Sequence, residues 1–250
     1  MIQDHVTFPN EHEQELSGFI RIPDEDGKYP VVIVCHGFMQ TKDRELYMDI
    51  ANLLSYQQFL TLRFDFLHHG ESHGETVQAS LTQMIEDIKD AIDFIEKIPQ
   101  ADKDRIAIIG HDLGGMAALL LKDKRVKAIC TIASRTSTEG FMNSYFDEYE
   151  IKEWKRDLKY DCQEITLGIA FLNDIYMHDV LEAAGTKHIP MLFINGTNDK
   201  RTPFDEAKRL FYHSKVRQLE IVDGADHNFT EKEHRMGIID VINNWLAQNL

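Results

Sequence analysis

An acidic residue lies between two glycines in the motif that carries the most chemical information. Residues 110–114 read Gly-His-Asp-Leu-Gly, after an apolar run over 106–109 and before a helix-like run over 116–121. A strand, a sharp turn and a helix in this order form a nucleophile elbow, whose strained central residue leaves no room for side chains at the flanking glycines. We therefore expect Asp112 to present its carboxylate above the sheet as a covalent nucleophile, with Gly110 and Gly114 making space for the turn.

Two further residues complete a catalytic set in the chain order nucleophile, acid, histidine. A carboxylate that has attacked its substrate holds an ester, and a base must activate the water that cleaves it. His227 follows the predicted strand 218–222 and is the candidate base. Asp199 lies in a polar turn after the predicted strand 191–194, and its charge would orient His227 and stabilise the imidazolium. Loops after parallel strands converge at one sheet edge, so the three residues predict a single site.

Two backbone amides are predicted to form the oxyanion hole. One belongs to Leu113, the residue after the nucleophile, at the start of a helix. The other belongs to Phe38, in the loop His36-Gly-Phe-Met39 after the strand over 31–35. Amides aimed at a developing negative charge stabilise it by roughly 2.7–4 kcal/mol per donor. We expect His36 and His111, which flank these turns, to pack or bond the backbone there.

The elements that position these residues alternate between strand and helix from about residue 30. Near-continuous apolar runs predict buried parallel strands at 31–35, 60–66, 106–109, 126–132, 191–194 and 218–222. The stretches 5–8 and 16–22 alternate in polarity and predict an antiparallel hairpin at one edge. Helix starts are predicted at the capping boxes beginning with Ser80 and Thr230. The sequence thus predicts an α/β fold with a mostly parallel eight-stranded sheet and helices on both faces.

One long segment interrupts the alternation. About fifty residues separate the strand that ends near Ser134 from the next one, far more than a plain connection needs. We interpret residues 135–188 as an inserted, mostly helical cap, with the core formed by 1–134 and 189–250. The segment is rich in aromatic residues, which pack the cap onto the core or line a substrate pocket. Its tyrosines are Tyr145, Tyr149, Tyr160 and Tyr176.

Composition narrows the function classes. The formal net charge of −15 disfavours nucleic-acid and anionic-membrane partners, and no run is long enough to span a bilayer. Three cysteines without metal-site spacing, and no signal-peptide pattern at the N-terminus, favour a reduced cytoplasmic location. We expect a small-molecule substrate. We expect no cofactor, since the sequence has no Gly-rich phosphate loop. We also expect no metal, because Asp65, His68 and His69 are best explained as a strand end and a turn. The oligomeric state stays open.

The combined motifs resemble those of the α/β-hydrolase family over essentially the whole chain. They are Val34-Cys-His-Gly-Phe38, Arg63-Phe-Asp-Phe66 followed by His69-Gly-Glu-Ser72, Gly110-His-Asp-Leu-Gly-Gly115, Gly196-Thr-Asn-Asp199 and Gly224-Ala-Asp-His227. Within the family, the chain is most similar to small bacterial feruloyl or cinnamoyl esterases. It departs from them at Asp112, because those esterases carry serine in the elbow. An aspartate there resembles the elbows of epoxide hydrolases and haloacetate or haloalkane dehalogenases.

Three functions follow from these residues. The first is a cofactor-independent hydrolase of small, partly apolar substrates in which Asp112 attacks a saturated carbon and forms an ester. The second is a carboxylic-ester hydrolase of the feruloyl or cinnamoyl type in which aspartate replaces serine, although carboxylate attack on an acyl ester would give a high-energy mixed anhydride. The third is a non-catalytic binding protein on the same scaffold. The dehalogenase alternative lacks a tryptophan or arginine beside the nucleophile, where Leu113 stands, and the epoxide alternative needs two cap tyrosines.

Overall fold

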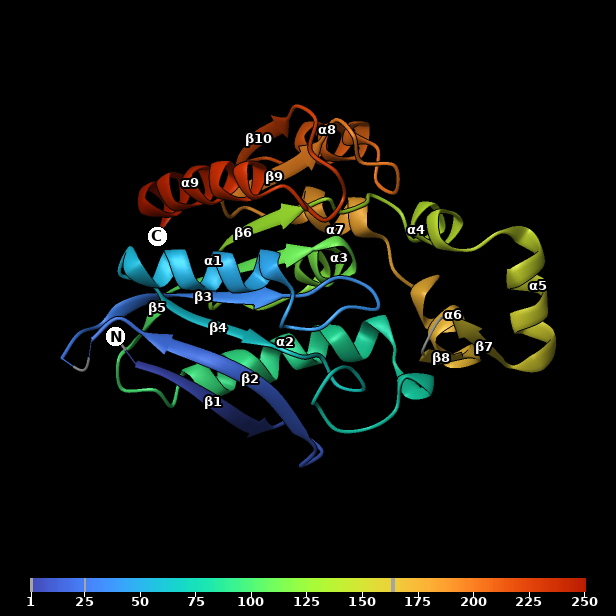
Figure 1. Cartoon of the computed structure of the whole chain (residues 1–250), viewed down its shortest axis with the longest axis horizontal. Helices are drawn as coiled ribbons and strands as arrows, with labels where there is room; N and C mark the ends of the chain where they lie inside the picture. The colour runs from blue at the N-terminus through green and yellow to red at the C-terminus, as the bar shows by residue number, and fades with distance from the viewer. Residues whose placement is uncertain (1, 25, 163–164) are drawn as a thin grey trace.

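The computed structural model describes residues 2–24, 26–162 and 165–250 of the chain, so positions 163 and 164 of the predicted cap lie outside it. Eight strands form one sheet in the order β1-β2-β4-β3-β5-β6-β9-β10 (Figure 1). Their bounds are β1 (Ile2–Pro9), β2 (Glu15–Ile22), β3 (Tyr29–Cys35), β4 (Leu60–Phe64), β5 (Ala101–His111), β6 (Val126–Ile132), β9 (Met191–Gly196) and β10 (Arg217–Val222). The predicted eight-stranded sheet is confirmed.

Six neighbouring strands of the sheet, β4, β3, β5, β6, β9 and β10, run parallel, and the N-terminal hairpin is antiparallel. β3 pairs in parallel with β4 and β5, and the pairs β5–β6, β6–β9 and β9–β10 are also parallel. β1 pairs antiparallel with β2, which joins β4 in the same sense. The predicted edge hairpin is therefore present, and the carboxyl ends of five central strands meet at one edge of the sheet, where α/β proteins place their sites.

Helices cover both faces of the sheet. Alternate residues of a strand point to opposite faces, so each strand contributes to two buried clusters, one on each face. Val32 and Val34 pack in the layer that contains α1 (Glu45–Tyr56) and α9 (Lys232–Asn249). Val31 and Ile33 pack in the opposite layer with α2 (Leu81–Ile95) and α3 (Asp112–Leu120). Successive side chains of a strand point to opposite faces, so burial on both sides produces the continuous apolar runs in the sequence. α8 (Phe204–His213) contacts β9 and β10.

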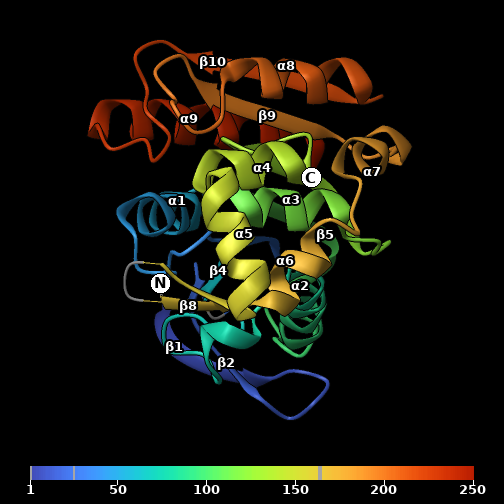
Figure 2. The same ribbon diagram turned by 90° about the vertical axis from the view of Figure 1, so that its right-hand side faces the viewer.

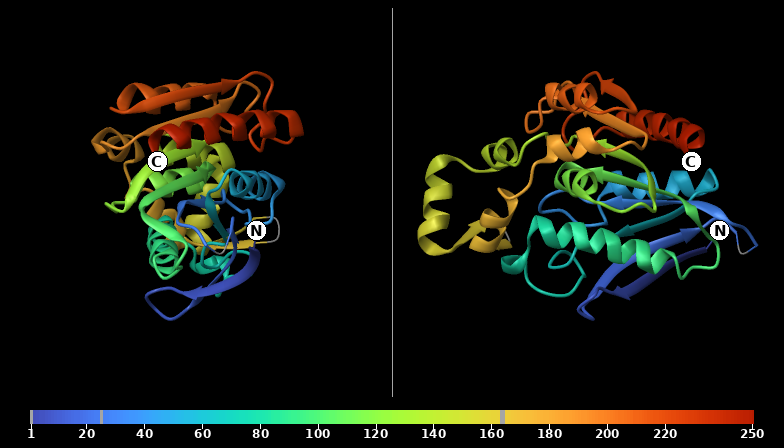
Figure 3. Two further views of the ribbon diagram at one scale, coloured as in Figure 1. Left: turned by 90° about the vertical axis from the view of Figure 1, so that its left-hand side faces the viewer. Right: turned by 180° about the vertical axis from the view of Figure 1, so that it is seen from behind.

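The segment after β6 extends beyond the sheet edge toward which the parallel strands point (Figures 1 and 3). It contains α4 (Thr138–Tyr145), α5 (Glu148–Asp157), α6 (Ile169–Ile175) and α7 (Val180–Thr186). It also contains an antiparallel pair of strands, β7 (Lys159–Cys162) and β8 (Ile165–Gly168), which the sequence analysis did not predict. A short 3-10 turn, η1 (Thr76–Gln78), contacts β8 from the core. In the end-on view of Figure 2, α4, α5 and α6 lie in front of this edge, whereas α7 packs on α3 and α8.

One predicted helix start is correct and one is wrong. The Ser80 hydroxyl accepts a 3.0 Å hydrogen bond from the Gln83 amide and caps α2 as predicted. The Thr230 hydroxyl instead donates to Asp226, and α9 begins at Lys232 without a side-chain cap. A carboxylate four residues upstream therefore competes for the hydroxyl that was predicted to cap the helix. No helix in the described ranges combines the length and the apolar character that a membrane span requires.

Candidate active site

The turn between β5 and α3 has the geometry of a nucleophile elbow. β5 ends at His111, α3 begins at Asp112, and Asp112 has a φ of 50°, in the left-handed region that non-glycine residues rarely adopt. A Cβ atom on Gly110 would lie 2.4 Å from the Gly114 carbonyl oxygen, and one on Gly114 would lie 2.3 Å from the His36 carbonyl oxygen. Both glycines are thus needed for close backbone packing, as the sequence predicted.

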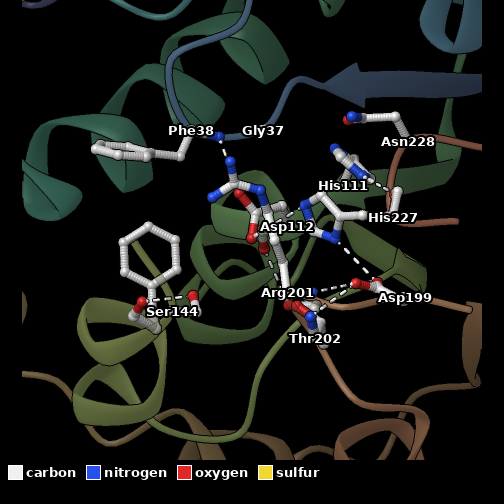
Figure 4. Close-up of polar contacts among 12 residues, drawn as sticks. Gly37, Phe38, His111, Asp112, Ser144, Asp199, Arg201, Thr202, His227 and Asn228 are labelled. Carbon is white, nitrogen blue, oxygen red and sulfur yellow. Dashed lines mark hydrogen bonds and ion pairs between the residues drawn. The ribbon is translucent and has the colours of Figure 1, made fainter. Parts of the chain in front are cut away.

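The Asp112 carboxylate is buried, and its two oxygens have different surroundings. Oδ2 accepts hydrogen bonds from the Phe38 amide at 3.1 Å and from the Tyr145 hydroxyl at 2.8 Å. Oδ1 lies 3.9 Å from Nε2 of His227, which is too long for a direct hydrogen bond. One oxygen is therefore held by donors, and the other faces the histidine (Figure 4).

His227 is fixed on its far side by Asp199. Nδ1 of His227 lies 2.9 Å from Oδ2 of Asp199, so it donates to this carboxylate. Oδ1 of Asp199 accepts from the amides of Arg201 at 2.9 Å and Thr202 at 2.8 Å, which fixes the acid in its turn (Figure 4). Nε2 of His227 is buried and, among the described residues, has no hydrogen-bond partner. With the proton on Nδ1, the lone pair of Nε2 is directed toward Asp112.

Nearby carboxylates set the protonation of His227. Burial acts to lower its pKa, but the hydrogen bond to Asp199 and the negative charges of Asp112 and Asp199 outweigh it, so the pKa of His227 is raised. The pKa of Tyr145 is also raised, by burial and by the adjacent Asp112 carboxylate, so its hydroxyl remains a protonated donor. The structure therefore brings together Asp112, Asp199 and His227 with the predicted Phe38 amide. Leu113 follows Asp112 in the first turn of α3.

The histidines that flank the turns have structural contacts, as predicted. His36 bonds the Gly37 carbonyl through Nδ1 at 2.9 Å and accepts from the Phe66 amide through Nε2 at 3.1 Å. His111 bonds the His227 carbonyl at 2.9 Å and the Tyr47 hydroxyl at 2.8 Å. Burial and the neighbouring His227 lower the pKa of His111 to about 4, so it stays neutral. His111 therefore joins the elbow to the backbone of the histidine loop.

The second group of polar residues serves the fold. Asp65 accepts hydrogen bonds from the amide and the ammonium group of Lys42, both at 2.7 Å, and from the Glu71 amide at 3.0 Å. His69 bonds the Leu67 carbonyl at 3.0 Å. These contacts account for Asp65 and His69, whereas Nδ1 of His68 is buried and has no hydrogen-bond partner among the described residues. Within 2–24, 26–162 and 165–250, no cluster of three or more His, Cys, Asp or Glu side chains is arranged to hold a metal ion.

Of the four named tyrosines, only Tyr145 contacts Asp112. Tyr145, at the end of α4, bonds Asp112, whereas the Tyr160 hydroxyl donates to Glu150 and Tyr149 and Tyr176 are exposed. Most other aromatic side chains of this segment pack together under Phe38, as their composition suggested; they include Phe141, Phe146, Trp154 and Phe171. The epoxide alternative requires two cap tyrosines, but only one lies at the site, and its hydroxyl donates to the Asp112 carboxylate.

A small cavity of about 150 Å³ lies beside Phe38 and Tyr145, the two residues that donate hydrogen bonds to Asp112. Phe38, Met39 and Cys162 form its apolar part. Its polar part consists of Gln40, Arg44, Tyr145, Arg201 and Asn228. Neither arginine is among the site residues predicted from the sequence, because a charged residue in a loop has no periodic pattern that would reveal its position.

Comparison with known proteins agrees with this fold. Residues 30–169 match the family model described as alpha/beta hydrolase fold. Esterase EstD from Thermotoga maritima is 28% identical over 88% of this chain and 52% of its own, and an uncharacterized protein, PA2218, from Pseudomonas aeruginosa is 30% identical over 62% and 43%. The chain thus spans about half, or less, of the length of these relatives. The structure of Est1E from Butyrivibrio proteoclasticus with ferulic acid has a TM-score of 0.86 at 18% identity, over 98% of both chains.

Proposed function

The chain belongs to the α/β-hydrolase fold family, and from this premise we propose that it is a hydrolase whose covalent nucleophile is the Asp112 carboxylate. The observation that carries the proposal is that the two oxygens of this carboxylate have different contacts. Oδ2 is held by the Phe38 amide and the Tyr145 hydroxyl, while Oδ1 faces Nε2 of His227. A serine in the elbow has only one oxygen and could not make both sets of contacts.

In the first step, Oδ1 attacks a saturated carbon of the substrate. The new Oδ1–carbon bond forms as the bond to the leaving oxygen or halogen breaks, and the leaving atom takes the electron pair. The product on the enzyme is an ordinary ester of Asp112. If the same carboxylate attacked an acyl ester, the product would be a high-energy mixed anhydride. Substrates that are cleaved at a saturated carbon are therefore favoured.

In the second step, His227 takes a proton from water at Nε2, and the resulting hydroxide attacks Cγ of Asp112. Negative charge then collects on Oδ2, where Phe38 and Tyr145 already donate and where the Leu113 amide, at the start of α3, is the third candidate donor. Collapse of this intermediate releases the alcohol with the original Oδ1 and a proton from His227. Asp199 keeps the imidazole oriented and stabilises its charged form.

An oxygen-isotope experiment tests the nucleophile directly. One turnover in heavy-oxygen water should place the label in the Asp112 carboxylate, because the water oxygen replaces the oxygen that leaves with the product. Mass spectrometry of the peptide that contains residue 112 measures it. Epoxide and organohalide panels supply the substrates, and His227→Gln should accumulate the ester on the same peptide. An active enzyme that incorporates no label at Asp112 and forms no adduct would falsify the covalent mechanism.

A second candidate is hydrolysis of carboxylic esters, favoured by the likeness to Est1E and EstD. In this case Asp112 and His227 would act as general bases on a water molecule, with no covalent intermediate. Asp112→Ser restores the nucleophile that esterases of this fold carry. A large gain of Asp112→Ser on short or aromatic acyl esters, together with no labelling of the wild-type carboxylate, would support this alternative over the covalent one.

A further inference from the structure

Tyr47 has a buried hydroxyl group at which separate parts of the site meet. It lies in the first turn of α1, and its side chain is 1% exposed. The hydroxyl accepts a hydrogen bond from the Gly37 amide at 2.9 Å, lies 2.8 Å from Nδ1 of His111 and also bonds the Gln40 side chain. A tyrosine hydroxyl has one hydrogen and two lone pairs, so three contacts use its full hydrogen-bonding capacity. All three partners belong to the loop after β3 or to the elbow, which indicates a role beyond packing.

His111 connects this hydroxyl to the loop that contains His227. Nε2 of His111 lies 2.9 Å from the His227 carbonyl oxygen, which carries no hydrogen, so Nε2 is protonated and donates. Since burial and the neighbouring His227 lower the pKa of His111 to about 4, its ring is neutral and Nδ1 carries no proton. Burial raises the pKa of Tyr47, so its hydroxyl keeps its hydrogen and donates it to Nδ1. The tyrosine thus fixes the tautomer and the orientation of the ring that supports the His227 backbone, on the side of His227 opposite Asp199 (Figure 4).

The loop after β3 packs directly against the elbow. A Cβ atom on Gly37 would lie 2.7 Å from Nδ1 of His111 and 3.1 Å from Cβ of Asp112. The next amide along this loop, that of Phe38, donates to Oδ2 of Asp112. By accepting from the Gly37 amide, the Tyr47 hydroxyl therefore fixes the backbone one residue before the amide that contacts the nucleophile.

A second set of hydrogen bonds joins the Tyr47 hydroxyl to the histidine loop. Gln40, which bonds this hydroxyl, also bonds the Asn228 side chain at 2.9 Å. Asn228 follows His227, whose ring centre lies 4.9 Å from that of His111. The connections through His111 and through Gln40 therefore both begin at the Tyr47 oxygen and end in the loop that contains the base.

We propose that Tyr47 is a positioning residue, whose hydroxyl acts through His111 to keep His227 and the Phe38 amide in register with Asp112. Tyr47 does not line the cavity beside Phe38, so it aligns the reacting groups without contacting the substrate. A displacement of about 1 Å in such groups can lower a rate by about 10²-fold. The inference rests on the proposed function, because it assigns a role in the same site. It applies both to covalent attack by Asp112 and to general-base activation of water.

Proton exchange at His227 tests the inference without a substrate. The Nδ1 proton of His227, which is donated to Asp199, gives a low-field NMR signal that is identified by its loss in His227→Gln. Tyr47→Phe keeps the buried ring and removes the hydroxyl. The Nδ1 proton should then exchange with water at least about tenfold faster, because local opening of the histidine loop becomes more frequent.

Thr61→Val is the matched control for this measurement. It removes another buried hydroxyl that bonds α1, through the Ala51 carbonyl at 3.1 Å. Thr61 lies near the start of β4, at the opposite end of the strand from the site. Exchange of the His227 proton in this variant should stay within about twofold of the wild-type rate, since distant sites do not couple.

Kinetics on a substrate from the panels above give the second readout. Tyr47→Phe should lower kcat about 10- to 100-fold and change KM by less than about threefold, because the hydroxyl aligns reacting groups and binds no substrate. His111→Gln should lower kcat to a similar extent. Addition of Tyr47→Phe to His111→Gln should cause less than about threefold further loss, because the tyrosine acts through the histidine.

Two results would overturn the inference: equal exchange of the His227 proton in Tyr47→Phe and Thr61→Val, or a double variant whose loss of kcat is the product of the two single losses. The outcome is separable from that of the nucleophile proposal. If exchange accelerates in Tyr47→Phe but no label enters Asp112 in turnover, the positioning role stands and the covalent mechanism fails. If label enters Asp112 and Tyr47→Phe changes neither exchange nor kcat, the covalent mechanism stands and the positioning role is wrong.

Discussion

The Tyr145 hydroxyl donates a 2.8 Å hydrogen bond to Oδ2 of Asp112, 33 residues earlier in the chain. The two residues belong to different parts of the molecule, the end of α4 in the inserted segment and the turn that follows β5. In the mechanism proposed above, this bond gives the segment after β6 a direct part in the chemistry, because it supplies a donor to the oxygen that would become negatively charged.

Tyr145→Phe should lower kcat about 10- to 100-fold with little change in fold. The substitution removes one donor from Oδ2 and leaves the ring against Phe38. The step that slows is cleavage of the ester, so the Asp112 adduct should accumulate during turnover. Rapid-quench mass spectrometry measures the adduct, and Tyr149→Phe, at an exposed site on α5, is the control. Unchanged kcat in Tyr145→Phe would show that the bond has no part in catalysis.

Activity should rise with pH along a limb whose midpoint lies above 6.5. His227 acts as a base only when neutral, and its pKa is raised because the bond to Asp199 and the charges of Asp112 and Asp199 outweigh burial. Asp199→Asn should move this limb to lower pH and reduce kcat by about 10³- to 10⁴-fold, since the imidazole loses its acceptor and tautomer control. The pH dependence of kcat for both enzymes tests this, and an unshifted limb in Asp199→Asn contradicts it.

Stability should depend on pH through the same histidine. A pKa that is higher in the folded than in the unfolded state contributes stability that is fully present below about 6.5 and is lost as pH rises through the folded-state value. The contribution of His227 should therefore fall above neutral pH. Urea denaturation of wild-type and His227→Gln proteins across this range measures it. The difference between them should shrink as pH rises, and a constant difference would exclude the linkage.

Two glycine substitutions should have opposite effects on stability. Gly110→Ala places a Cβ 2.4 Å from a backbone oxygen in the elbow and should cost about 3 kcal/mol or more of unfolding free energy, because backbone must move. Gly237→Ala, on an exposed position of α9 with nothing within 4 Å of the added carbon, should gain about 0.4–1 kcal/mol. Chemical denaturation compares the two. An elbow that tolerates alanine at 110 without loss would refute the steric explanation.

Lys42→Met should destabilise the fold by about 3–5 kcal/mol. The Lys42 ammonium is fully buried and lies 2.7 Å from Oδ2 of Asp65, itself fully buried, so its removal leaves an uncompensated charge. Lys208→Met removes an exposed lysine that pairs with Asp205 on α8 and should change stability by less than about 1 kcal/mol. Urea unfolding of the two variants is the measurement. Equal stability of the two variants would mean that the buried pair makes no net contribution.

Strand positions were predictable because both sheet faces are covered. The runs at 31–35 and 126–132 correspond to β3 and β6 within two residues, and β4 is shorter than the predicted 60–66 by two. Burial on both faces favours apolar residues at most positions of a strand, and this signal needs no tertiary information. The β7–β8 pair gave no such signal, since its short strands are half exposed. Thr230 failed as a cap because Asp226 competes for its hydroxyl.

The sequence by itself determined the order of the catalytic candidates and the strand ends on which they lie. Glycines on both sides of Asp112 encode a local turn, and parallel strands place Asp199 and His227 at the same edge of the sheet. Only the tertiary structure decided that the Tyr145 hydroxyl bonds Oδ2 of Asp112 and that Arg201 stacks on the Tyr145 ring. These contacts join residues far apart in the chain through the path of the inserted segment. Periodicity and capping report local conformation and burial, so they contain no information about which distant side chains meet.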